Sequence, residues 1–234
     1  MIRKLEHELG AFGSQLHRRR PPLCPELELW LLGDDVDLEI ACDALPEGVA
    51  PPFWAFCWGS GQALARFLLD RPGLVRGRHI VDLGAGSGIA GIAAARAGAA
   101  RVVALDRDPR ARLCAQLNAE LNGLEIETSF QLPGEWDLML AADVLFDSGL
   151  RSWLLGPARQ HGPILLGDPE RTGAPRLDRP SFARMQATTF PDVDSPCKSV
   201  ALHWFQKLDP HCRASECDGL LRSGQTSPGL VPGP

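Results

Sequence analysis

Short apolar runs alternate with longer segments of helical spacing from residue 78 onward. We expect strands over 79–83, 101–106, 124–130, 137–142 and 163–167, and helices over 61–70, 88–98, 109–122 and 147–160. Residues 181–206 are expected to supply the last helix and the last strands. Alternation of this kind predicts an α/β domain whose mostly parallel sheet is covered by helices on both faces.

The two ends of the chain show different patterns. Residues 1–45 are expected to form an N-terminal extension, with an amphipathic surface helix over 1–20. Apolar and polar positions alternate over 27–32 and again over 36–40 around a Gly-Asp-Asp turn, which predicts a small antiparallel hairpin. Residues 207–234 are rich in Gly, Pro and Ser with little periodicity, so we expect a disordered tail there.

Three glycines alternate as G-x-G-x-G between the first predicted strand of the sheet and an Ala-rich helix. Gly84 and Gly86 let the backbone turn sharply and approach a ligand without Cβ interference, and Gly88 is expected to let the new helix pack close to the strand. In the dinucleotide motif G-x-G-x-x-G, the third glycine would stand where this chain has Ile89. The spacing therefore favours S-adenosylmethionine over NAD as the ligand of this loop.

The next strand ends in an acid, Asp106, which lies 20 residues beyond Gly86. A carboxylate at this distance can accept hydrogen bonds from both hydroxyls of a ribose. The alternative for Asp106 is a helix cap. However, Asp108 followed by Pro109 offers a better N-cap and first turn for the next helix, so we favour the ribose interpretation.

Another strand, over 137–142, ends at Asp143, and Phe146 follows three residues later. Right-handed crossovers bring the carboxyl ends of parallel strands to one edge, so both residues should lie near the glycine loop. The glycine loop, the acid after the second strand and this D-x-x-F pattern together resemble the seven-β-strand S-adenosylmethionine-dependent methyltransferases, and among them those that methylate protein lysines. The resemblance covers about residues 50–206. It implies a Rossmann-like, seven-stranded, mostly parallel sheet.

Two further segments narrow the resemblance. Residues 53–70, which begin Phe-Trp-Ala-Phe-Cys-Trp-Gly, and residues 164–171, Ile-Leu-Leu-Gly-Asp-Pro-Glu-Arg, are similar to segments of the electron transfer flavoprotein β-subunit lysine methyltransferases, a branch also named nicotinamide N-methyltransferase-like. The resemblance implies a methyltransferase domain over 46–206 that uses S-adenosyl-L-methionine as cofactor and methylates lysine in that flavoprotein subunit. Related enzymes often carry a Trp after the third strand to cover the adenine. Here residues 131–134 are Gln-Leu-Pro-Gly and Trp136 comes only at the next strand, so the adenine cover stays open.

The expected site divides into a cofactor-binding set and a catalytic pair. The cofactor-binding residues are expected to be Trp58, Asp82, Gly84, Ala85, Gly86, Gly88, Asp106 and Ala142. Methyl transfer from a sulfonium mainly needs alignment and exclusion of water, but a lysine ammonium, with a pKa of about 10.4, must first lose a proton. We expect Asp143 to accept a hydrogen bond from the amine or hold the incoming cation, and Phe146 to shelter it by a cation–π contact. Asp82 is expected to bond loop amides or the cofactor's amino group, Asp168 to shape the far side of the substrate entrance, and Asn118 to be structural.

Several of these residues have a purely structural alternative. Asp143 could cap the helix predicted at 147–160, although Asp147 or Ser148 would serve that end equally well. Aromatic residues such as Phe146 and Trp58 are more often part of a core than of a ligand site. Only the spacing of Phe146 from Asp143, and the position of Trp58 before a glycine as in the family, favour the functional interpretation.

Composition argues against several other classes. A net charge of −5 over 234 residues gives no basic face for nucleic acid. Seven scattered cysteines without C-x-x-C spacing indicate reduced thiols in the cytoplasm, and no metal site is expected. No apolar run approaches the about 20 residues that span a bilayer, so we expect no membrane partner. We expect a monomer.

Three other functions are alternatives to protein-lysine methylation. An N-methyltransferase for a small amine or pyridine would need a lid that closes over its substrate, whereas a protein lysine needs an open acidic or mixed rim. A non-catalytic adenosylmethionine-binding protein would keep the cofactor residues without turnover. An NAD oxidoreductase is disfavoured by Ile89 and by the absence of tyrosine from the whole chain.

Overall fold

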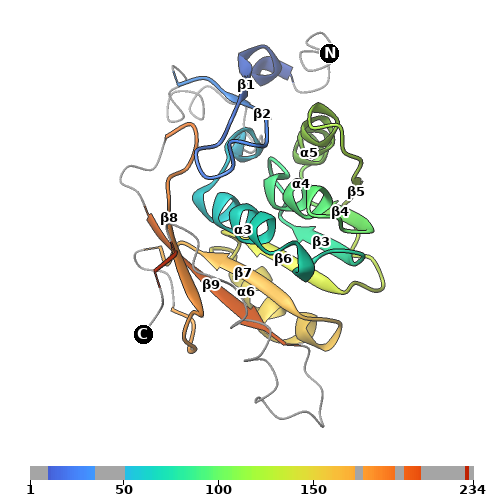
Figure 1. The fold of residues 1–234 in the computed structure, drawn as a ribbon, viewed down its shortest axis with the longest axis vertical. Helices are drawn as coiled ribbons and strands as arrows, with labels where there is room; N and C mark the ends of the chain where they lie inside the picture. The colour runs from blue at the N-terminus through green and yellow to red at the C-terminus, as the bar shows by residue number, and fades with distance from the viewer. Residues whose placement is uncertain (1–9, 35–50, 172–175, 193–197, 207–229, 232–234) are drawn as a thin grey trace.

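The computed structural model describes residues 10–34, 51–171, 176–192, 198–206 and 230–231. Within these ranges one large sheet is flanked by helices, and a two-stranded ribbon lies beside it (Figure 1). The strands are β1 (Leu16–Arg19), β2 (Leu29–Leu32), β3 (His79–Leu83), β4 (Arg101–Leu105), β5 (Glu127–Ser129), β6 (Leu138–Ala142), β7 (Ile164–Asp168), β8 (Ala183–Ala187), β9 (Lys198–Phe205) and β10 (Leu230–Val231). The α-helices are α3 (Gly59–Asp70), α4 (Ile89–Arg96), α5 (Pro109–Leu121) and α6 (Ser148–Leu155), and the 3-10 helices are η1 (Gly10–Gln15), η2 (Phe53–Ala55), η3 (Pro72–Leu74) and η4 (Pro157–Gln160).

The order of the large sheet is β10-β8-β9-β7-β6-β3-β4-β5. The five strands β7, β6, β3, β4 and β5 are parallel to one another. Strand β9 is antiparallel to both β7 and β8, so β8 again runs in the direction of the parallel set. The predicted seven-stranded, mostly parallel sheet is confirmed, and the two residues of β10 extend its edge in the described part of the chain.

Alternate side chains of the central strands belong to two separate cores. Ile80 and Leu138 pack with residues of α3 and α4 on one face. Val81 and Met139, their immediate neighbours, pack with Leu154 of α6 on the other face. This two-sided burial explains why the strands are continuous apolar runs, and it confirms that helices cover both faces (Figure 1).

Differences from the predicted elements lie mainly at their ends. Strand β5 keeps only three of the seven residues expected over 124–130. The helix expected over 147–160 ends at Leu155, because Gly156 leaves the helical conformation and Pro157 starts the separate turn η4. The helix expected within 181–206 is absent from the described residues of that segment, which form β8 and β9.

The N-terminal prediction was wrong in its described part. Residues 10–19 form the 3-10 helix η1 and the strand β1 instead of an amphipathic α-helix, because Leu16 pairs with Leu32 of β2 and packs into a shared apolar cluster. Strand β2 thus has β1 as its partner, and the expected partner over 36–40 lies outside the described residues. Of the tail expected to be disordered, residues 230–231 form β10, and the rest also lies outside the described part.

Candidate functional site

The glycine loop runs across the carboxyl end of β4 with its backbone exposed to any ligand at that edge. Gly84, Gly86 and Gly88 have left-handed φ values of 65°, 53° and 80°, which favour glycine over other residues. The amides of Gly84 and Ala85 both donate to the Leu105 carbonyl, at 2.8 and 3.2 Å. A Cβ built on Gly86 meets no atom closer than 3.9 Å, so a cradle of bare main chain lies open at this position.

Gly88 packs against a helix and not against the strand, which corrects the expectation for this residue. A Cβ on Gly88 would lie 2.8 Å from the Cβ of Ala115 in α5. The close approach between helix and strand is made by Gly91 instead, whose Cβ would lie 3.0 Å from Oδ2 of Asp82 and 3.1 Å from a methyl of Val102. Gly91 was not among the predicted site residues, although it continues the glycine series into α4.

Asp106 joins the end of β4 to the glycine loop. Its Oδ2 accepts the Gly86 amide at 3.0 Å, and its Oδ1 accepts the Asp108 amide at 2.9 Å. The cap of α5 is Asp108, whose side chain accepts the Arg110 amide at 2.8 Å, as expected. A carboxylate has about four lone-pair sites, so both oxygens of Asp106 keep the capacity to accept a further hydrogen bond.

Asp82 is buried beneath this loop and is 2% exposed. Its Oδ2 accepts the Gly91 amide of α4 at 2.8 Å, so its backbone partner lies in the helix and not in the loop. Burial raises the pKa of Asp82 to about 7; the Gly91 hydrogen bond opposes this, and the charge of Asp106 adds to it. The described contacts of Asp82 are those of a residue that fixes α4 to β3.

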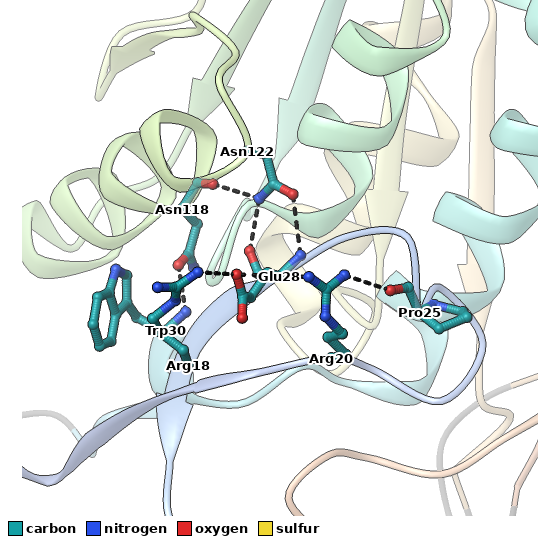
Figure 2. A network of polar contacts seen from close by, with 7 residues as sticks. All are labelled: Arg18, Arg20, Pro25, Glu28, Trp30, Asn118 and Asn122. Atoms are coloured by element: carbon teal, nitrogen blue, oxygen red, sulfur yellow. Dashed lines mark hydrogen bonds and ion pairs between the residues drawn. The ribbon is translucent and has the colours of Figure 1, made fainter.

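Asn118 is a structural residue, as expected, and it also supports the glycine loop. It is fully buried in α5, where its Oδ1 accepts the Trp30 amide at 2.6 Å and its Nδ2 donates to the Ser87 carbonyl at 2.9 Å. One turn later, Asn122 accepts the amide of Glu28 and donates to its carbonyl (Figure 2). The N-terminal strand β2 is thereby tied through α5 to the loop.

Asp143 lies directly after β6, beside the glycine loop. The Cβ that Gly84 lacks would lie 2.9 Å from a methyl of Val144, the next residue. Asp143 has a left-handed φ of 53°, and its carboxylate forms a two-pronged ion pair with Arg171, with Nε–Oδ1 at 3.0 Å and Nη2–Oδ2 at 2.5 Å. The cap of α6 is Asp147, so the capping alternative for Asp143 is not observed.

Arg171 is the main site residue that sequence reasoning missed. It stands four residues after Gly167, whose carbonyl accepts the Asp143 amide at 3.0 Å. The signal was available, because β6 and β7 were both predicted as parallel strands, and charged residues that follow neighbouring strands meet at one edge. The sequence pattern could not predict that Asp143 and Arg171 form an ion pair, because this pair also depends on the left-handed backbone of Asp143.

The Asp143–Arg171 pair lines a pocket of mixed charge at this edge. The other lining residues are Leu145, Phe146, Arg151, Asp168, Glu170 and Arg176. Phe146 is 68% exposed and is therefore a rim residue and not part of the core. Asp168 also lines this pocket, and its expected role at the substrate entrance stays a prediction. Burial raises the pKa of its carboxyl, and the hydrogen bond from the Glu170 amide opposes this.

Trp58 borders the same region from the start of α3. Its indole Nε1 donates to the Phe53 carbonyl at 2.9 Å, and the guanidinium carbon of Arg171 lies 5.6 Å from its ring centre. Ala142, half-buried, ends β6 just before Asp143. Trp136, in the segment between β5 and β6, is buried next to His161.

Two features are absent from the described residues. No group of three or more His, Cys, Asp or Glu side chains there is arranged to hold a metal ion. No helix among them has both the length and the apolar character required to cross a membrane.

Comparison with known proteins gave consistent matches. The family of ribosomal protein L11 methyltransferases (PrmA) matches residues 62–148. Among curated proteins, the electron transfer flavoprotein β-subunit lysine methyltransferase of Xenopus laevis is 42% identical over 163 residues, which are 64% of this chain and 65% of the relative. Its counterpart in Homo sapiens is 40% identical over 131 residues, 51% of this chain and 50% of the relative. A homolog in Caenorhabditis elegans is 35% identical over 175 residues, 64% of this chain and 71% of the relative.

The chain therefore spans about half to two thirds of the length of most of these relatives. Among solved structures, a Pyrococcus horikoshii protein described as "a putative RNA methyltransferase" superposes with a TM-score of 0.53 at 16% identity, covering 74% of this chain and 97% of that one. At this identity the likeness concerns the fold alone.

Proposed function

We propose that this protein, which belongs to the electron transfer flavoprotein β-subunit lysine methyltransferase family, is an S-adenosylmethionine-dependent protein-lysine N-methyltransferase. Membership in the family confirms the resemblance seen in the motifs. The proposed methyl acceptor is a lysine of the flavoprotein β-subunit, which the relatives' names specify. The observation that carries the proposal is the 3.0 Å contact between the Asp106 carboxylate and the Gly86 amide, at the edge where Val144, next to Asp143, also meets Gly84.

The residues at this edge fit the cofactor. The open space at Gly86 gives a nucleoside direct access to main chain, and Asp106 keeps lone pairs for two ribose hydroxyls. Trp58 and Ala142 are proposed to complete the walls, with Gly84, Ala85 and Gly88 shaping the turn and Asp82 holding α4 in place. When bound, the cofactor supplies a sulfonium methyl group to the acceptor amine.

Asp143 and Phe146 are the proposed catalytic pair. A neutral amine must present its lone pair to the methyl group, so the amine's remaining hydrogens need an acceptor that fixes its direction. The carboxylate of Asp143, with its side chain 12% exposed beside the pocket, is the proposed acceptor. The exposed ring of Phe146 is proposed to cover the amine and its aliphatic chain.

The pocket supports a protein acceptor over a small molecule. Its lining carries three carboxylates and three guanidinium groups, which is the mixed rim that suits a peptide backbone and a lysine side chain. The exposed rings of Phe53 and Phe146 add apolar area near it. We further propose a monomer in the cytoplasm, since the described cysteines, Cys24, Cys57 and Cys114, are free and buried.

The direct test is methyl transfer to candidate acceptors. Purified protein would be incubated with isotopically labelled S-adenosylmethionine and either a cell extract or purified electron transfer flavoprotein, and the products would be digested and read by mass spectrometry. The proposal expects label on one or more lysines of the β-subunit. Asp143→Asn protein, which keeps the size of the side chain, serves as the matched control and should leave the lysines unlabelled.

Two other outcomes would contradict this proposal in different ways. Label confined to small molecules would assign the protein to the amine or pyridine N-methyltransferases. Binding of the cofactor without any labelled product in a complete extract would favour a non-catalytic adenosylmethionine-binding protein.

A further inference from the structure

Two non-glycine residues of the described chain have a left-handed backbone, and both line the proposed substrate pocket. They are Asp143, with a φ of 53°, and Glu170, with a φ of 49°. Each carboxylate is held by an arginine in a two-pronged ion pair, Asp143 by Arg171 and Glu170 by Arg184. Such backbone strain persists only where the surroundings fix it, and it concentrates at functional sites. The ion pairs are therefore part of what shapes this pocket.

Arg171 connects the proposed amine acceptor to the aromatic wall. Its fork engages both carboxylate oxygens of Asp143, and its guanidinium carbon lies 5.6 Å from the ring centre of Trp58. The Asp143 side chain is 12% exposed and that of Arg171 is 35% exposed, so the pair lies at the pocket surface and not in the core. Each oxygen of Asp143 accepts one hydrogen bond from this fork, and a carboxylate oxygen can accept more than one.

We infer that Arg171 is a positioning residue of the reaction: it fixes the Asp143 carboxylate and compensates its charge, so that a lysine amine facing Asp143 can lose its proton. This inference rests on the function proposed above and assigns to that site a residue beyond the catalytic pair. Arg171 acts through Asp143 and does not need to touch the methyl group.

The physical reason is the effect of charge on the pKa of the acceptor amine. A carboxylate alone beside an ammonium stabilises the charged form and raises its pKa by about 1–3 units, and a neighbouring cation opposes this. The charged groups that face Asp143 across the pocket are Arg151 of α6, Asp168 at the end of β7, and Glu170, Arg171 and Arg176 in the following segment, with Arg184 of β8 paired to Glu170. With Arg171 present the lining has three carboxylates and three guanidinium groups, and its removal takes one positive charge from beside Asp143.

The test is the pH profile of lysine methylation for Arg171→Gln protein, with the flavoprotein β-subunit as acceptor between pH 6 and 10. Removing the Arg171 cation should move the acid limb of the kcat profile to higher pH by about one unit. As a result, kcat should fall about tenfold near pH 7 and return to most of its wild-type value at high pH. KM for the acceptor should not rise, because the Asp143 carboxylate still attracts the ammonium. A merely structural role would lower kcat at every pH and leave the limb in place.

Two further variants make the test specific. Arg171→Lys keeps the charge but loses the fork, so its limb should stay at the wild-type position while kcat falls at all pH values. Arg101→Gln removes the same side chain from an equivalent fork with Glu127 at the opposite end of β4, where the bonds are 2.7 and 2.6 Å, and it should leave the profile unchanged. Circular dichroism shows whether each variant is folded. If Arg171→Gln does not fold, the profile of Arg171→Lys decides.

The outcomes separate this inference from the function on which it rests. If wild-type protein methylates the lysine but the limb of Arg171→Gln does not move, or that of Arg171→Lys moves upward, the inference is overturned and the function stands. If wild-type protein methylates no lysine at any pH, the proposed function and the inference fall together. A shifted limb in Arg171→Gln with an unshifted one in Arg171→Lys and Arg101→Gln supports the inference.

Discussion

Replacement of Gly88 by alanine tests how the glycine loop is held against the rest of the domain. The residue has a φ of 80°, and an alanine in this left-handed region costs about 1–2 kcal/mol. Its Cβ would lie 2.8 Å from the Cβ and 3.0 Å from the Cα of Ala115, both fixed atoms of α5. The strain of such overpacking adds about 1–3 kcal/mol to this loss of stability. The free energy of unfolding should therefore fall by about 2–5 kcal/mol.

A matched control separates the two contributions. Gly123, at the end of α5, has a similar φ of 67°, but a Cβ built there meets no atom within 4 Å. Gly123→Ala should lose only the conformational part, about 1–2 kcal/mol. Urea denaturation measures both variants, and the change should be in the midpoint and not in the slope.

Removal of the Ala115 methyl should restore part of the stability that Gly88→Ala loses. In the double variant Gly88→Ala with Ala115→Gly, the clashing methyl of Ala115 is gone. The double variant should therefore lose less stability than the sum of the losses in the two single variants, and the difference is the steric part. Equal destabilisation by Gly88→Ala and Gly123→Ala, with additive behaviour in the double variant, would refute the reasoning.

Three other changes test separate parts of the site. Asp143→Ala should abolish methyl transfer while the Kd for S-adenosylmethionine stays within a few fold by calorimetry; a large loss of affinity would instead make Asp143 a cofactor ligand. Asp82→Asn removes a carboxyl whose pKa of about 7 in the folded protein lies above its usual value of 3.8. The wild type should therefore lose stability relative to the variant as pH rises from 4 to 7, by up to about 1.4 kcal/mol per pH unit. Parallel curves of stability against pH for the two proteins would contradict this. Asn118→Ala leaves the Trp30 amide and the Ser87 carbonyl without their side-chain partner and should cost about 2–6 kcal/mol in urea denaturation, whereas a loss below about 1 kcal/mol would mean that water replaces both bonds.

Local patterns were sufficient to predict the central sheet. The strands β3, β4, β6 and β7 are buried on both faces, so each is mostly apolar and ends in or just before an acid or a glycine. The role of Asp108 as cap could be predicted because its partners lie within the next few residues. The proximity of Asp106 to the glycine loop followed from the parallel order of the strands alone.

The features that escaped prediction depend on contacts between distant segments. Leu16 lies in a strand only because Leu32 pairs with it, and a window of residues around Leu16 carries no trace of that partner. Gly88 meets Ala115 of α5 and not the strand beside it, because the turn of the loop points its missing Cβ away from the sheet. The ion pair of Asp143 with Arg171 requires both the adjacency of β6 and β7 and a left-handed backbone, which composition and spacing do not encode.

Calorimetric titration of S-adenosylhomocysteine, the demethylated cofactor, into wild-type and Asp106→Ala protein tests whether the cofactor binds between the glycine loop and Asp106. We expect saturable binding at one site per wild-type chain and an affinity about tenfold or more lower in the variant, because a charge-assisted contact to the ribose contributes about 1.5–3 kcal/mol. Absence of binding to the wild type, or equal affinity for both proteins, would contradict the placement of the cofactor between the glycine loop and Asp106.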